Sequence, residues 1–151
     1  MKFTITAIGK MKDSAQQALM EEYRKRLPWQ VTIRESEVKK SLSGDALAVE
    51  EGKLLLASVP EHSRKIVLDE RGKSLSSEAF AKTIADWQNQ GVSDVSFLIG
   101  GASGHGDEVR QQADLLLSFG QMTWPHMLVR LLLVEQLYRA WTILEGHPYH
   151  K

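Results

Sequence analysis

The stretch that decides the fold is the last third of the chain, SFGQMTWPHMLVRLLLVEQLYRAWTILEGHPYHK, from Ser118 to Lys151. It predicts a short polar loop, a Pro125-His126 step into a long helix, and a tail rich in His and Tyr. A surface helix ordinarily carries one apolar stripe opposite a broad polar face. Here apolar residues surround most of the helix, so it needs packing partners on two sides, and we expect a functional site beside a subunit interface. The few polar positions of this helix are Arg130, Glu135, Gln136, Arg139 and Thr142.

Composition indicates a single globular domain. The 151 residues are enough for one core, with 42% hydrophobic and 25% charged residues. The alternating FTITAI near the start is unlike a signal peptide, and the most apolar run, residues 127–144, contains three charges and predicts no membrane span. Because the chain has no cysteine, disulfides and thiolate chemistry are excluded, and we expect a cytoplasmic protein.

Charge is balanced overall but uneven along the chain. Residues 1–75 carry 14 Lys and Arg against 11 Asp and Glu, whereas residues 76–151 carry 5 against 8. A net charge of zero means that any contact with nucleic acid is local, and solvated surface charge is the commoner explanation of basic clusters. These clusters are Arg24–Arg26, Lys39–Lys40, Arg64–Lys65 and Arg71 with Lys73.

Strand and helix patterns alternate along the chain without internal repeats. Such alternation indicates a mainly parallel sheet with helices on both faces, so the predicted fold class is α/β. The predicted strands are residues 2–8, 30–35, 65–69, 95–99 and 115–119, and the predicted helices begin near Ser14, Asp45, Ser76, Asp107 and Pro125.

Local polar residues predict where several elements begin or end. Ser14–Gln17 matches a capping box, Asp45 is a good N-cap, and Ser76 or Ser77 caps a further helix. After the third strand, residues 70–73 predict a polar turn.

The most informative local pattern is a buried strand that runs into glycines, VSFLIGGASGHG from Val95 to Gly106. Ligands of open α/β sheets bind at the carboxyl ends of strands, where glycines let the backbone approach closely. Both phosphate-binding motifs fail, because Asp107-Glu108 stand where a P-loop needs Lys and Ser or Thr, and Val109 replaces the last glycine of a dinucleotide motif. A nucleoside-like cation without phosphate, such as S-adenosylmethionine, is compatible, although an ordinary glycine turn is more common.

Histidines offer little sign of a metal centre. His62 and His105 are expected to face solvent in loops. A site built on His147 and His150 would need further ligands that the sequence does not supply, so no metal is predicted.

Two arginines of the last helix are better candidates for functional residues. Burial of an unpaired Arg is costly, so Arg130 and Arg139 either reach solvent or a carboxylate such as Glu135, or meet an anionic substrate. Their spacing leaves both explanations open. No Ser-His-Asp arrangement or nucleophile elbow is present.

Five segments together resemble one family over essentially the whole chain. Their order, spacing and place at the C-terminus are similar to those of the ribosomal RNA large subunit methyltransferase H family, small enzymes of the SPOUT class. The segments are VLDERGK (67–73), SFLIGGASG (96–104), MTWPHMLVR (122–130), LLVEQLYRAW (132–141) and HPYHK (147–151).

This resemblance implies a fold and a reaction. The fold is an α/β knot, in which the C-terminal segment forms a deep trefoil knot that ordinary topology rules would exclude. The resemblance also implies a homodimer whose knotted regions pack together. The reaction transfers a methyl group from S-adenosylmethionine to N3 of a pseudouridine in helix 69 of large-subunit (23S) ribosomal RNA, within the assembled 70S ribosome.

The resemblance also implies site residues, with the tail of one subunit completing the site of the other. An arginine of the last helix would stabilise negative charge on the target base, and a histidine or a water would accept its proton. The implied cofactor-binding residues are Leu68, Gly100, Phe119, Gly120, Gln121, Met122, Thr123 and Trp124, and the implied catalytic residues are His126, Arg130, Arg139, Tyr149 and His150.

Two rival functions stay open beside this one. A non-catalytic ribosome-binding factor would keep the fold without the cofactor, although Gly100, Gly101 and the complete tail argue against it. An enzyme for a phosphorylated nucleotide is disfavoured by Asp107-Glu108.

Overall fold

Five strands form one sheet in the order β2-β1-β4-β3-β5, and every neighbouring pair is parallel. The computed structural model describes residues 1–151 and confirms the predicted α/β class and the alternation of strands and helices. The strands are β1 (Lys2–Ile8), β2 (Gln30–Ser36), β3 (Arg64–Ser74), β4 (Asp94–Ile99) and β5 (Leu115–Ser118). The helices are α1 (Ser14–Arg26), α2 (Gly44–Ala57), α3 (Ser77–Asn89), α4 (Asp107–Gln111) and α5 (His126–Glu145), with a final 3-10 turn η1 (Pro148–His150).

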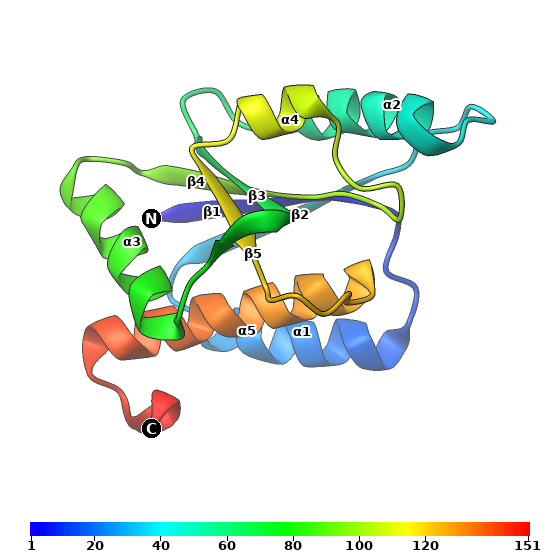
Figure 1. Ribbon diagram of the computed structural model, residues 1–151. Helices are drawn as coiled ribbons and strands as arrows, with labels where there is room; N and C mark the ends of the chain where they lie inside the picture. Colours follow the sequence, from blue (N-terminus) through cyan, green and yellow to red (C-terminus); the bar gives the residue numbers. More distant parts are fainter.

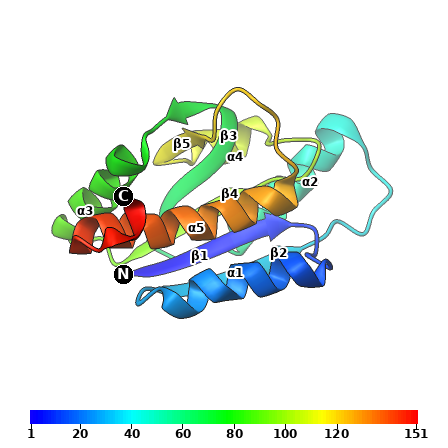
Figure 2. The ribbon, with the colours of Figure 1, turned by 90° about the horizontal axis from the view of Figure 1, so that it is seen from below.

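Helices cover both faces of the sheet, as parallel strands require. Figure 1 shows α2 and α4 on one face and α1, α3 and α5 on the other. Helix α5 packs against both α1 and α3, and Figure 2 shows α1 and α5 side by side across the sheet. The expected need of α5 for partners on two sides is therefore met in part within the chain, while the subunit interface stays a prediction.

The side chains of the strands alternate between two cores. On the α5 face, Phe3, Ile5 and Phe97 pack with Leu133 and Leu137 of α5 in the larger cluster. A smaller cluster on the α2 face holds Ile8, Leu55, Val67, Leu98 and Val109. Several apolar side chains of α5 remain partly exposed, and Leu132 and Leu144 are exposed.

Two helix starts differ from the sequence prediction. At α1 the cap is Asp13, whose carboxylate accepts a hydrogen bond from the Gln16 N–H at 2.9 Å, so the predicted capping box at Ser14 is wrong. At α2 the N-cap is Ser43, and Asp45 lies in the first turn, where its charge suits the helix dipole. The predicted cap by Ser76 is confirmed by its hydrogen bond from the Ala79 N–H.

Strand β3 is longer than predicted. Leu68 and Lys73 both pair with Leu117 of β5, so the residues between them form an irregular bulge rather than a turn that ends the strand. At Gly72 an added Cβ would lie 2.6 Å from the backbone of Leu116, which only glycine avoids. The bulge places residues 69–72 above the carboxyl edge of the sheet.

The chain ends in a tail that folds back on α5. Gly146, with φ of +70°, terminates the helix in the left-handed conformation, and η1 then packs against α5 (Figure 1). The trefoil knot implied by the family resemblance stays a prediction. None of the helices is both long and apolar enough to cross a membrane.

Candidate functional site

A cavity of about 430 Å³ lies at the carboxyl ends of β3, β4 and β5. This size is typical of sites for small organic ligands, and the carboxyl edge is where open α/β sheets bind them. The walls come from residues 68–71, 99–105, 117–120 and 122–124, with the first turn of α5 on one side. Of the eight residues predicted to bind the cofactor, all but Gln121 line this cavity: Leu68, Gly100, Phe119, Gly120, Met122, Thr123 and Trp124.

Two glycines bring the backbone of the β4–α4 turn to the cavity wall. A Cβ at Gly100 would lie 3.1 Å from Cε1 of His105, and one at Gly101 would lie 3.0 Å from Oε2 of Glu51. The side chains of His105 and Glu51 already occupy the space beside these two glycines. A larger residue at either position would therefore displace these side chains or narrow the cavity. Close backbone approach is what the glycines predicted.

His105 is buried, so the prediction of a solvent-facing side chain is wrong. The ring packs behind Gly100, and Nε2 lies 3.0 Å from the carbonyl oxygen of Leu68. Burial lowers the pKa of His105, while the nearby Asp69 carboxylate opposes this shift. A neutral ring can donate an N–H to the Leu68 carbonyl and fix the end of β3 at the cavity.

Asp69 and Arg110 form an ion pair in the cavity wall that sequence reasoning missed. Arg110 Nε donates to Asp69 Oδ2 at 2.8 Å, and the Arg71 N–H donates to Oδ1 at 2.8 Å. Burial alone would raise the pKa of Asp69, but these hydrogen bonds and the Arg110 charge lower it overall. The pair joins β3 to α4 and holds the bulge of β3 in place.

The start of α5 carries two of the predicted catalytic residues. His126 lines the cavity, whereas Arg130 lies behind it and is fully buried. The Arg130 guanidinium donates to Glu35 at 2.7 Å and to the carbonyl oxygens of Ile8 and Gly9 at 2.6 and 2.8 Å. Burial lowers the pKa of Arg130, and Glu35 opposes the shift. Its partner is therefore a carboxylate 95 residues away, where the sequence suggested Glu135 as an example.

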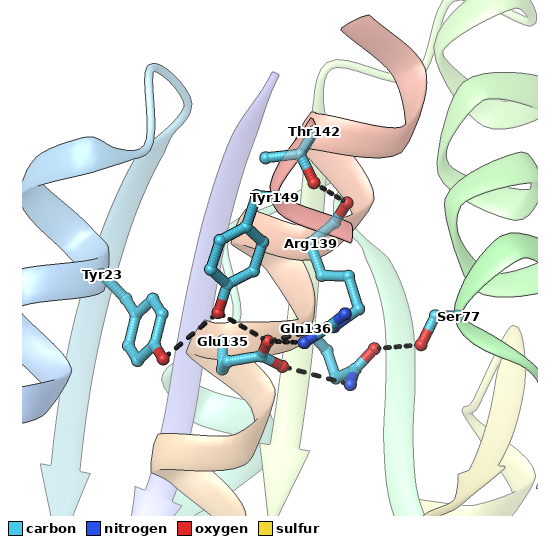
Figure 3. Close-up of polar contacts among 7 residues, drawn as sticks. All are labelled: Tyr23, Ser77, Glu135, Gln136, Arg139, Thr142 and Tyr149. Carbon is cyan, nitrogen blue, oxygen red and sulfur yellow. Dashed lines mark hydrogen bonds and ion pairs between the residues drawn. The ribbon is translucent and has the colours of Figure 1, made fainter. Parts of the chain in front are cut away.

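The far half of α5 carries a second polar cluster, drawn in Figure 3. Arg139 donates from Nε and Nη2 to Oε1 of Glu135, at 3.0 and 2.6 Å. The Tyr149 hydroxyl lies 3.0 Å from the same oxygen and 3.2 Å from the Tyr23 hydroxyl, and its ring lies beneath the Arg139 guanidinium. Gln136 continues the cluster to Ser77 of α3, at 2.8 Å. The tail is thus held by α1 and α5 together.

The predicted site residues fall into two groups within one chain. His126 and Arg139 are 13 residues apart on one helix, which separates them by about 20 Å. Tyr149 and His150 belong to the Arg139 group, and Nδ1 of His150 is buried without a hydrogen-bond partner. No group of three or more His, Cys, Asp or Glu side chains could hold a metal ion.

Comparison with known proteins places the chain in a family. A family profile described as "Predicted SPOUT methyltransferase" matches residues 1–150. Ribosomal RNA large subunit methyltransferase H of Paramagnetospirillum magneticum is 52% identical over 151 residues, and that of Rhodospirillum centenum is 50% identical; each match covers 100% of this chain and 99% of the relative.

A solved structure shows a similar fold. A probable methylase family protein from Haemophilus influenzae aligns with a TM-score of 0.56 at 11% identity, over 99% of this chain and 70% of that one. At this identity the likeness concerns the fold alone. The full-length sequence matches go further: the chain belongs to the ribosomal RNA large subunit methyltransferase H family of SPOUT methyltransferases.

Proposed function

We propose that this protein is a methyltransferase of large-subunit ribosomal RNA that uses S-adenosylmethionine. Family membership supports the enzyme class and the ribosomal RNA substrate. The observation that carries the proposal is the cavity at the carboxyl ends of β3, β4 and β5, where three loops distant in sequence converge. At the finer level we propose N3 of a pseudouridine in helix 69 of 23S RNA as the target, within the assembled ribosome and therefore in the cytoplasm.

The residues around the cavity fit this cofactor. Gly100 and Gly101 expose backbone groups, and the loop from Phe119 to Trp124 adds two aromatic side chains that suit an adenine ring. No lysine lines the wall, and its only arginines are the Asp69-paired Arg110 and the exposed Arg71, in keeping with a ligand that carries no phosphate. When bound, this cofactor supplies an electrophilic methyl group on a sulfonium.

A homodimer is part of the proposal, because one chain separates the two groups of site residues by about 20 Å. If the α5 helices of two subunits pack together in opposite directions, Arg139, Tyr149 and His150 of one subunit approach the cavity of the other. Partly exposed apolar side chains on α5, including Leu132 and Leu144, favour such packing. The trefoil knot of the family would place the β5–α5 loop at this interface.

Within the composite site the contacts favour different roles for the two arginines. Arg130 has a carboxylate and two carbonyl oxygens as partners and is fully buried, which suits positioning of the α5 start. Arg139 is 30% exposed and can direct its remaining N–H groups to the base. It would stabilise the negative charge that develops on uracil oxygens when N3 loses its proton. His150, His126 or a water would accept that proton.

The experiment that tests the proposal is mass spectrometry of ribosomal RNA after ribosomes are incubated with the protein and S-adenosylmethionine. We expect one added methyl group, on the helix 69 pseudouridine. A methyl group on another base would overturn the target while sparing the reaction class. Calorimetric titration that detects no cofactor binding at millimolar concentration would leave the non-catalytic ribosome-binding factor as the function.

A further inference from the structure

Glu51 of α2 is a buried carboxyl group without a partner. Its side chain reaches the backbone of Gly101, the residue is 6% exposed, and Oε1 has no hydrogen-bond partner. Burial raises the pKa of Glu51, and no cation or hydrogen bond opposes the shift. Its neighbour Glu50 is the usual case, because it is held by Lys53 at 3.0 Å on the outer face of the same helix.

Such a group is unusual in a folded protein. Buried carboxylates are ordinarily paired or hydrogen-bonded, and a carboxylate kept unpaired in a wall is a sign of functional electrostatics. Core packing does not explain this one, because an apolar side chain of the same length would fill the space without the cost of desolvating a charge.

The position of Glu51 relates it to the cavity. Its two carboxylate oxygens lie 3.0 and 3.3 Å from the point where a Cβ of Gly101 would be, and Gly101 lines the cavity. The carboxylate therefore lies directly against a residue whose backbone lines the cavity.

The other charges of the wall do not cancel that of Glu51. Asp69 is paired with Arg110, and His105 is buried, with a pKa lowered by desolvation. Glu70 and Arg71 lie at the exposed rim and have opposite signs. An ionised Glu51 on the β4–α4 side of the cavity thus has no paired cation to neutralise its charge.

We propose that Glu51 determines which form of the cofactor the cavity prefers, by favouring the sulfonium-bearing methyl donor over the product, which lacks that charge. This inference rests on the proposed function. The donor carries a sulfonium, and the product left after the sulfur–methyl bond breaks carries a neutral thioether. A fixed negative charge behind Gly101 attracts the first and has no such attraction for the second, so it strengthens donor binding and leaves product binding unaffected.

Calorimetric titration of the dimer with S-adenosylmethionine and with S-adenosylhomocysteine, at mildly alkaline pH, tests the proposal. Charges several ångströms apart at a protein wall interact strongly enough that Glu51→Gln should weaken donor binding about tenfold, or about 1.4 kcal/mol. Binding of the product should be unchanged. The matched control Glu50→Gln removes an equal charge one residue away in water, where screening should leave both affinities unchanged.

A second variant guards against an effect of the amide itself. Glu51→Met removes the charge with an apolar side chain of similar length and should lose the same preference. Both variants should remain as stable as the wild-type protein in urea unfolding, since they remove an unpaired buried charge.

The outcomes separate this inference from the function on which it rests. If both Glu51 variants keep the donor-to-product affinity ratio of the wild type, or weaken both ligands equally, the role of Glu51 is overturned while the methyltransferase stands. If the wild type binds neither ligand, both proposals fall.

Discussion

The two halves of α5 each carry an arginine, and the two arginines differ in burial and in hydrogen-bond partners. Arg130, near the start, is fully buried and donates to a carboxylate and two carbonyl oxygens from β1 and β2. Arg139, nine residues later, is 30% exposed and shares Glu135 with Tyr149 of the tail. One arginine fastens elements of the fold to each other, and the other holds a cluster that is partly exposed to solvent.

This difference shows what decides the role of an arginine in an apolar helix. Burial of a guanidinium is energetically tolerated only where hydrogen-bond partners are held in place for it. For Arg130 these partners lie at the ends of two strands. An exposed guanidinium can exchange partners with water or a ligand at little cost. Burial therefore separates a structural ion pair from a functional one more reliably than the identity of the residue.

Replacement of Arg130 should have the largest effect on stability. Arg130→Met removes the charge partner of Glu35, which keeps only its hydrogen bond from the Met11 N–H, and leaves the carbonyls of Ile8 and Gly9 without this donor. The free energy of unfolding should therefore fall by about 3–5 kcal/mol. Arg139→Met, the matched change on the same helix, should cost about 1 kcal/mol or less, because its pair is partly exposed. Urea unfolding of both variants measures the contrast, and equal losses would contradict it.

Arg139 and Tyr149 should instead dominate activity. If the tail completes the site of the other subunit, Arg139→Ala and Tyr149→Ala should lower the rate of ribosomal RNA methylation by about a hundredfold or more while cofactor binding is retained. Radiolabelled methyl transfer to ribosomes and calorimetry with the cofactor measure the two quantities separately.

Mixed dimers show whether the two halves of α5 act across subunits. A subunit with Tyr149→Ala, paired with one whose cavity is blocked by Gly101→Val, retains one intact composite site if the tail acts in trans. Such dimers should recover part of the activity that neither parent has. Activity that never recovers would mean that the two groups do not meet.

Much of this arrangement was predictable from local sequence. The alternation of Phe3 and Ile5 with threonines predicts a strand, because side chains of a strand repeat every two residues and a short segment is enough to show the pattern. The apolar run before Gly100 predicts a buried strand. The cavity loops follow from the same patterns, since parallel strands end at one edge of the sheet. Seven of the eight residues assigned to the cofactor by family resemblance line the observed cavity.

The rest depends on contacts that sequence spacing does not encode. The pair of Arg130 with Glu35 joins residues 95 positions apart, and the burial of His105 depends on the end of β3. The extension of β3 past its bulge follows from pairing with β5, so residues 70–73 by themselves resemble a turn. The unpaired state of Glu51 also becomes visible only when Gly101 is placed against it.

Among these predictions, the smallest and most local effect should be a change in the titration of Tyr149 in the cluster around the tail. Burial, together with hydrogen bonds to Tyr23 and Glu135, raises the pKa of Tyr149 above its ordinary value. A raised folded-state pKa means that docking of the tail is fully favourable below about pH 10 and weakens as pH rises through the folded value.

Absorbance titration of tyrosinate should therefore show a late step that Tyr149→Phe removes. Tyr23→Phe should move this step toward lower pH, because it removes one of the hydrogen-bond partners without taking away Glu135. If neither substitution changes the late part of the curve, the tail is not held by this cluster, and the contrast between the two halves of α5 would then rest on Arg130 alone.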